Sequence, residues 1–417
     1  MHLPLEIWRE VFTYACTDGG YTGASLALVC KLFYNASHQV RFRSLSFYSL
    51  DQIEYFLEYV QRCEGRFRGA QPKVYHLLLS FSQTSSDGRS DAEFSPGAVS
   101  HAYCTDADAW ATARRLRQHE KAMWDHKFLQ LVPALLELVA PHLRTLALLQ
   151  SDGHTVPALR NALPRLRELT LLVGISAVFH GDPALDPSGR SAASPPSPDS
   201  TNSPESSSLW DADGVEARVS ATPSSPHARF PALERLHLVC GRLRDFRLRD
   251  ALAYVPRHAP ALTHLRISNA TYTHAQCIPA FLCAVLGVPA PEFECVAGTA
   301  AVRFVRIPPR SQTMPVGGAG DDWDVGVKAG LPGLRRVIVH SVLPLPGARC
   351  GSPYMEYTAL MNAVDAVDVA CDKAAGVSVH PIRSDRQKHR YWEVLVTRQW
   401  MERIEDGRGC WVGGGPP

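Results

Sequence analysis

A short pattern of leucines recurs along the chain and restricts its possible folds more than any other feature. The pattern is L-x-x-L-x-L, with Val or Ile replacing Leu at some positions, and it occurs six times. Alternate residues of an extended segment point to opposite sides, so each copy predicts a strand with one apolar face to bury. The copies begin at Val74, Leu143, Leu166, Leu233, Leu262 and Leu334.

The spacing of these copies predicts an array of stacked strands. Leu146 and Leu169 lie 23 residues apart, and Leu236 and Leu265 lie 29 residues apart, within the roughly 20–29 residues of a leucine-rich repeat. One unit cannot bury its leucines alone, whereas stacked units share a continuous core. We therefore predict an irregular leucine-rich-repeat-like solenoid, with a generic α/β domain as the alternative. Prolines that orient the chain precede four copies by two residues, at Pro164, Pro231, Pro260 and Pro332.

Longer gaps between the copies hold other elements. Residues 107–139 are rich in helix-forming residues and predict a helix, and residues 302–307 alternate apolar and basic residues like an additional strand. Residues 354–371 have apolar residues at three- and four-residue steps, which predicts an amphipathic helix. Residues 391–396 predict a strand and residues 400–404 a short helix, together a cap for the end of the array.

Residues 181–229 differ in composition from the rest of the chain. They are rich in Ser and Pro and almost free of large aliphatic residues, so they lack the apolar surface that offsets the entropy of ordering. We predict a disordered insert in the solenoid, and a second, glycine-rich loop over residues 311–330. Ser-Pro steps in the insert are possible phosphorylation sites, although an unmodified spacer explains the composition equally well; they lie at Ser194, Ser197, Ser203 and Ser225.

The N-terminal segment predicts two apolar helices joined by a glycine-rich loop. Leu3, Ile7 and Val11 fall at helical spacing, next to Trp8 and Phe12. A second apolar helix begins near residue 25, after a loop that contains three glycines. A hairpin of this size cannot bury so much apolar surface against itself. The surplus must face the rest of the chain or another protein.

This segment resembles an F-box motif, and more narrowly the F-box-like proteins of basidiomycete fungi. The resemblance rests on Leu3-Pro4-Leu5-Glu6-Ile7 with Val11-Phe12, and on the run LALVCKLF that ends at Phe33. The first loop is longer than usual, and Phe33 stands where many members have Trp. The resemblance implies that the helices dock on the Skp adaptor of an SCF-type cullin-RING ubiquitin ligase and that the remaining chain captures a protein substrate for ubiquitination.

The resemblance also assigns adaptor docking to particular residues. The alternative is a leucine-rich-repeat interaction scaffold that joins no ligase, in which the same helices cap the array. The residues assigned to the adaptor are Leu3, Pro4, Ile7, Trp8, Val11, Phe12, Leu28, Val29, Cys30 and Phe33.

Charged residues occupy many positions between the motif leucines. In a stack of parallel strands these positions line one open face, which predicts a mostly basic surface for an acidic or phosphorylated partner. An ordinary solvated face is the competing interpretation. The candidate substrate-face residues are Arg144, Arg167, Arg235, His237, His264, Arg266 and Arg335.

Composition and motif searches argue against several other functions. The chain has 43 Lys+Arg and 41 Asp+Glu, a formal net charge of +2, which does not favour a nucleic-acid partner. We expect no membrane span and no secretory signal, because neither a long apolar run nor a basic N-terminal region is present. The sequence has no phosphate loop, G-x-S-x-G, H-E-x-x-H or C-x-x-C motif. We therefore expect no enzyme activity, cofactor or metal, and a location in the cytoplasm or nucleus.

These observations together predict an α/β chain in five segments. The F-box-like helices come first, and the insert divides the repeat region in two. The segments are residues 1–45 (F-box-like helices), 46–180 (first part of the repeat region), 181–229 (insert), 230–410 (second part with its cap) and 411–417 (flexible tail).

Overall fold

The computed structural model describes fourteen segments of the chain. The glycine-rich loop over residues 311–330 and the insert over residues 181–229 lie almost wholly outside the described residues, as does most of the predicted tail. The described residues are 3–63, 72–81, 107–150, 161–172, 228–240, 248–275, 277–288, 292–295, 302–305, 330–344, 352–374, 376–384, 392–405 and 407–411.

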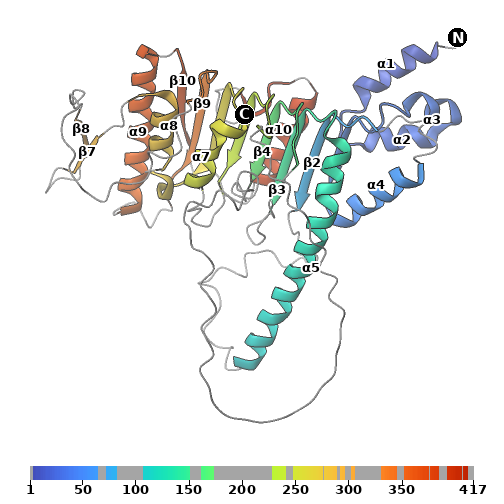
Figure 1. The fold of residues 1–417 in the computed structure, drawn as a ribbon, viewed down its shortest axis with the longest axis horizontal. Coiled ribbons are helices and arrows are strands. Elements are labelled where there is room, and N and C mark those ends of the chain that lie inside the picture. Colours follow the sequence, from blue (N-terminus) through green and yellow to red (C-terminus); the bar gives the residue numbers. More distant parts are fainter. Residues whose placement is uncertain are drawn as a thin grey trace.

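All six copies of the leucine pattern form strands of one eight-stranded parallel sheet (Figure 1). The strands follow one another across the sheet in sequence order, and every neighbouring pair is parallel. The predicted α/β class and strand stacking are therefore confirmed. The strands are β1 (Ser44–Phe47), β2 (His76–Phe81), β3 (Thr145–Gln150), β4 (Glu168–Leu172), β5 (Arg235–Val239), β6 (His264–Ala270), β9 (Arg336–Val342) and β10 (Ser378–Ser384).

The register places the motif leucines in line across the sheet. Leu77 of β2 pairs with Leu146 of β3, which pairs with Leu169 of β4, and the row continues through Leu236 and Leu265. All five side chains are buried. Each repeat thus adds a leucine to one continuous core instead of building a core of its own.

A proline stands two residues before each copy of the motif. In four copies the proline occupies the second position of a turn that is closed by a hydrogen bond of 3.0–3.2 Å, as between the Leu166 amide and the Leu163 carbonyl around Pro164. Proline suits this position because its fixed φ matches the turn. Pro72 and Pro141 stand at the same place before β2 and β3, so the proline precedes all six copies and not only the four noted in the sequence.

Helices cover the face of the sheet that carries the aligned leucines. The predicted helix over 107–139 is confirmed as one helix that contains Pro133, and its N-terminal half extends away from the sheet in Figure 1. The predicted helix over 354–371 is also confirmed. The helices on this side are α4 (Leu50–Cys63), α5 (Ala107–Val139), α7 (Leu248–His258), α8 (Cys277–Leu286) and α9 (Ser352–Ala374).

The opposite face of the sheet is also covered, which the sequence analysis did not predict. Helix α10 (Trp392–Ile404) and the short 3-10 turn η7 (Gly409–Trp411) pack on it; we call these two elements the strap. The predicted strand over 391–396 is wrong, since residues from Trp392 onward are helical. The strap does not close the end of the array. It covers a second apolar core made of strand residues that alternate with the motif leucines, among them Leu78, Leu149 and Val239.

Two short strands stand apart from the main sheet. β7 (Glu292–Cys295) pairs in antiparallel fashion with β8 (Val302–Val305). The extra strand expected near residues 302–307 therefore exists, but it is not a further unit of the parallel array.

Candidate functional site

The N-terminal module consists of three helices instead of the predicted two. α1 (Leu5–Ala15) matches its prediction, whereas the predicted second helix is divided into α2 (Tyr21–Val29) and α3 (Lys31–Ser37). Cys30 breaks them with an extended backbone (φ −165°, ψ 169°), and its sulfur accepts a hydrogen bond from the Phe33 amide at 3.5 Å. Cys30 thus begins α3 as its cap and cannot continue α2.

Three aromatic side chains form the centre of this module. The ring centroids of Trp8, Phe12 and Phe33 lie 4.8–5.6 Å apart, within the range of favourable aromatic contacts. Phe12 is only 3% exposed, so its predicted role in contacting an adaptor is wrong: it packs inside the module. Trp8 and Phe33 are half-buried and mainly support the helices.

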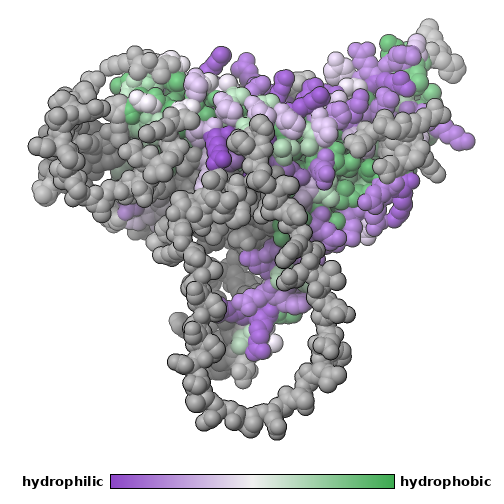
Figure 2. All heavy atoms as spheres, viewed as in Figure 1, coloured by the Kyte–Doolittle hydropathy of each residue, from purple (hydrophilic) through white to green (hydrophobic). Residues whose placement is uncertain are grey.

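The remaining predicted docking residues lie at the surface. Ile7 and Val11 are one turn apart on α1 and are 43% and 47% exposed, and Leu28 at the end of α2 is 87% exposed. Figure 2 shows hydrophobic residues at the surface of this end of the molecule, among hydrophilic ones. We call the seven exposed residues of the prediction the apolar surface: Leu3, Pro4, Ile7, Val11, Leu28, Val29 and Cys30.

The glycine-rich loop attaches the module to the sheet. The carbonyl of Gly19 accepts hydrogen bonds from the Ser46 amide and hydroxyl at 3.0 and 3.1 Å, and its amide donates to the Ser44 hydroxyl at 3.0 Å. Gly19 and Gly20 have φ values of +76° and +101°, which favour glycine. The loop therefore covers the outer edge of β1, a position at which an unpaired strand invites aggregation.

Close packing fixes α2 against the chain that leads into β1. A Cβ atom on Gly23 would lie 2.3 Å from the carbonyl oxygen of Arg41, so only glycine permits this approach. Arg41 is buried, and its guanidinium lies over the rings of Tyr34 and Phe42 at 4.9 and 4.7 Å. The orientation of the module relative to the sheet is thus set by packing as well as by hydrogen bonds.

The predicted substrate-face residues divide into two groups. Five lie at the edge of the sheet where the strands begin, because they stand at or just before the first residue of a strand: Arg144, Arg167, Arg235, His264 and Arg335. The other two, His237 and Arg266, are 1% and 6% exposed. Their predicted place on an open face is wrong, because the strap covers this part of the sheet.

The strap is held by polar contacts with the buried residues. Arg266 donates hydrogen bonds to the Ser268 hydroxyl at 2.9 Å and to the backbone carbonyl of Cys410. His237 contacts the same Ser268 hydroxyl at 2.9 Å, and the ring of Trp411 lies edge-on to His237 with centroids 6.4 Å apart. His237 and Arg266 therefore bind the chain's own C-terminal segment.

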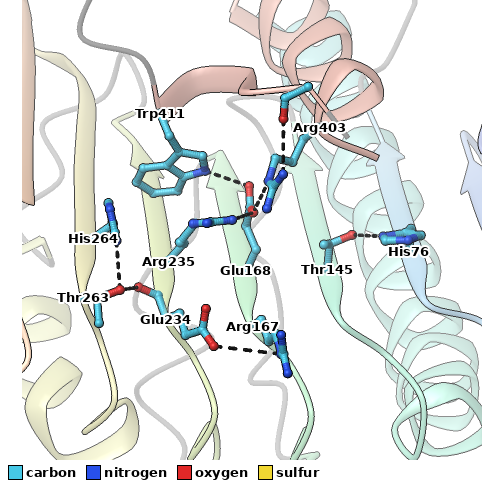
Figure 3. Close-up of polar contacts among 11 residues, drawn as sticks. His76, Thr145, Arg167, Glu168, Glu234, Arg235, Thr263, His264, Arg403 and Trp411 are labelled. Carbon is cyan, nitrogen blue, oxygen red and sulfur yellow. Dashed lines mark hydrogen bonds and ion pairs between the residues drawn. The ribbon is translucent and has the colours of Figure 1, made fainter. Parts of the chain in front are cut away.

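Glu168 joins the strap to the start of the sheet (Figure 3). Its carboxylate accepts hydrogen bonds from Arg403 Nε at 3.0 Å and from Trp411 Nε1 at 2.8 Å, and Arg235 Nη1 lies 3.4 Å away. The carboxylate is nearly buried, so three donors compensate the cost of removing its charge from water. Arg235 and Arg403 therefore share one carboxylate, whose single negative charge offsets one of their two positive charges.

Histidines in this region remain neutral. Burial, followed by the charges of Arg43, Arg144 and Arg403, lowers the pKa of His76 from 6.5 to about 3. Burial and the charge of Arg266 also lower the pKa of His237. Arg43 and Arg144, which contribute to the lowered pKa of His76, stand directly before strands, and Arg403 lies in the strap.

Two hollows lie along this edge. The first has a volume of about 330 Å³ and is lined by residues of α1, the strand starts and α10, including Arg43, Arg144, Arg167 and His76. The second, of about 360 Å³, shares Arg144 and Arg167 and adds Arg165. The sequence did not predict either hollow. Of the five arginines that line the first one, four precede or begin strands and the fifth, Arg403, lies in the strap.

Some residues of these hollows were missed in the sequence. Arg43 stands directly before β1, as Arg144 stands before β3. The motif at β1 has Phe42 and Phe47 at two of its leucine positions, which hid it from a search for leucines. Arg403 carried no local signal, because it reaches the site only through the path of the strap.

Within the described ranges, no group of three or more His, Cys, Asp or Glu side chains is placed to hold a metal ion. No helix in the part of the chain that the structure describes is both long enough and apolar enough to cross a membrane.

Comparisons with known proteins give no family for this chain. No protein-family model, no curated protein and no solved structure matches it. The observations from which a function has to be inferred are therefore the apolar surface, the strap, and the edge of the sheet with Arg43, Arg144 and Arg167, which we call the basic edge.

Proposed function

We propose that this chain is the substrate-receptor subunit of an SCF-type cullin-RING ubiquitin ligase. In this proposal the three N-terminal helices are an F-box-like module that docks on a Skp-type adaptor. The parallel sheet and its helices form an irregular leucine-rich-repeat-like region that recruits a protein substrate. The chain itself acts as a bridge and performs no chemistry.

The apolar surface is the observation that carries the proposal. Seven of the ten residues that the resemblance assigns to docking are exposed, while Trp8, Phe12 and Phe33 pack behind them. Fully burying an Ile or Val side chain contributes roughly 1.5–3 kcal/mol, and Ile7 and Val11 still have 43% and 47% of their surface to bury. A rigid module that presents several such side chains suits a partner with a complementary apolar groove.

A second role of the module is supported by its attachment to β1. The hydrogen bonds between Gly19 and the β1 serines favour the interpretation of the helices as a cap for the array. This is the expectation for an interaction scaffold that joins no ligase. The two roles are compatible, since the cap contacts use Gly19 of the loop and the proposed docking uses other, exposed residues of the module.

Substitutions on the apolar surface test the ligase proposal. We expect the double variant Ile7→Asp, Val11→Asp to bind a purified Skp-type adaptor at least about 30-fold more weakly, the effect typical of losing a central contact of an interface. Both side chains are exposed, so the thermal unfolding midpoint should change little. Binding is measured by titration of the full chain with the adaptor.

Val369→Asp provides a matched control. Val369 lies on α9 and is 59% exposed, so this variant introduces one exposed carboxylate far from the module and should bind the adaptor normally. Adaptor binding that is equal in the double variant, the control and the unmodified chain would contradict the docking proposal. No binding by the unmodified chain would favour the scaffold.

A further inference from the structure

A row of arginines runs along the edge of the sheet where the strands begin. The carbonyl of Arg144 accepts hydrogen bonds from the amides of Arg167 and Glu168 at 2.8 and 3.0 Å, and the carbonyl of Tyr75 accepts from the amide of Arg144 at 2.8 Å. These bonds hold the backbones of Arg144 and Arg167 on adjacent segments of the sheet, about 4.8 Å apart. Arg43 stands at the same place before β1. The backbone therefore fixes the positions of three cationic side chains.

The first hollow has more positive than negative groups. Its lining includes Arg43, Arg144, Arg167, Arg235 and Arg403 against two carboxylates, Glu168 and Glu234. As described above, Glu168 is used by Arg235 and Arg403. The lining of the second hollow includes three arginines and no carboxylate.

The other arginines lack a strong counter-charge. Glu234 lies 3.9 Å from Arg167, and both side chains are largely exposed, so this pair is weak. Within the described part of the chain, Arg43 and Arg144 make no ion pair. Their guanidiniums lie 5.3 and 4.9 Å from the centre of the Tyr75 ring. The Nε of Arg43 is buried and has no hydrogen-bond partner among the described residues.

The first hollow also has threonines beside the arginines: Thr13 and Thr17 at the end of α1 and Thr145 on β3. The hydroxyls of Thr13 and Thr17 already donate hydrogen bonds to the carbonyls of Arg9 and Tyr14, at 2.8 and 3.1 Å. The guanidinium groups are therefore the donors that suit phosphoryl oxygens here. The two hollows share Arg144 and Arg167, so one extended ligand can contact both.

We propose that Arg43, Arg144 and Arg167 bind a phosphoserine or phosphothreonine on an extended polypeptide segment. The phosphoryl group occupies the first hollow between the arginines and the threonines, and flanking residues of the segment extend into the second. This inference gives a ligand class to the receptor role proposed above and rests on it for its biological meaning. Binding itself requires no adaptor.

Phosphopeptide binding to the full-length chain tests the proposal. The probes are a degenerate nonapeptide library with a central phosphoserine, the same library with serine, and inorganic phosphate as competitor. We expect the immobilised protein to retain the phosphoserine library at least tenfold more than the serine library, and millimolar phosphate to compete. We expect Arg144→Glu, Arg167→Glu to abolish this preference. Arg144→Gln, Arg167→Gln should weaken it at least tenfold with less risk to folding.

Arg335→Glu is the matched control. Arg335 lies in the same row but lines neither hollow, so this variant should retain the phosphoserine preference. Equal retention of both libraries, or equal loss in the control, would overturn the inference, because attraction would then be a non-specific effect of charge. Preferential retention of a single-stranded RNA probe over the phosphopeptides would also overturn it. Adaptor binding by the arginine variants, which keep the apolar surface, shows separately whether the ligase proposal stands.

Discussion

His340 illustrates how a single buried residue under the strap affects stability. It is 3% exposed, neither ring nitrogen has a hydrogen-bond partner among the described residues, and its ring lies edge-on to Trp392 at 5.2 Å. Burial and the charge of Arg266 lower its pKa from 6.5 to about 4. The folded state therefore holds this histidine neutral, while the unfolded chain binds a proton more readily.

This difference in pKa predicts a loss of stability in acid. Above about pH 6.5 His340 is neutral in both the folded and the unfolded chain and does not change the free energy of unfolding. As the pH falls from 6.5 toward 4, the unfolded chain binds a proton at His340 and the folded chain does not, so the free energy of unfolding falls. Between pH 7.5 and 5 we expect the unmodified chain to lose about 2 kcal/mol more unfolding free energy than His340→Leu. Urea unfolding at several pH values measures this. His380→Leu, at an exposed position of β10, is the control and should follow the unmodified chain. Parallel pH curves for His340→Leu and the unmodified chain would contradict the assignment.

At the scale of elements, α10 derives its position from one side of the helix. Trp392, Val396, Trp400 and Ile404 recur at four-residue steps and are all buried against the sheet. Val394 on the opposite side is 65% exposed. The helix is therefore amphipathic, and its apolar side belongs to the second core.

Substitutions on the two sides of α10 should have different effects. We expect Trp400→Ala to lower the free energy of unfolding by roughly 3–5 kcal/mol, the usual effect of truncating a buried Trp. Val394→Ala should change it by less than about 0.5 kcal/mol. Chemical denaturation followed by circular dichroism distinguishes them. A small effect of Trp400→Ala would mean that the strap contributes little to stability.

The strands and the strap show how far the sequence predicts this fold. The motif strands could be predicted because alternation of leucines is a local signal. Residues 391–396 were assigned to a strand because a short apolar run does not distinguish strand from helix. A signal for the covered second face was present: Leu78, Leu149 and Val239 are apolar at positions that an open face would leave polar, and such continuous apolar strands are typical of sheets buried on both sides.

The candidate sites were predicted to different degrees. Seven of the ten predicted docking residues lie at the surface, while Trp8, Phe12 and Phe33 pack behind them, because helical spacing alone does not say which side of α1 faces inward. The basic edge was predicted in part. Positions between the first two motif leucines gave Arg144 and Arg167, whereas His237 and Arg266 were misplaced because the prediction left this face of the sheet open.

At the scale of the whole molecule, the N-terminal module both covers an edge and presents a surface. We expect deletion of residues 1–40 to lower the thermal unfolding midpoint and to cause concentration-dependent association, because the edge of β1 loses the loop that covers it. Light scattering after size-exclusion chromatography measures the association. The variant Ile7→Asp, Val11→Asp keeps the loop and should remain monomeric. A deleted chain that stays monomeric with an unchanged midpoint would show that the module contributes no cap.

The position of the strap after β10 in the chain has a consequence for synthesis. During translation every strand of the parallel sheet leaves the ribosome before α10 does. The apolar face made by Leu78, Leu149 and Val239 therefore stays exposed to solvent and accessible to chaperones until the strap emerges. A ribosome that pauses before codon 392 has not yet added α10 to the chain. Such a pause prolongs the time in which one apolar face of the sheet is uncovered and can be bound by quality-control factors.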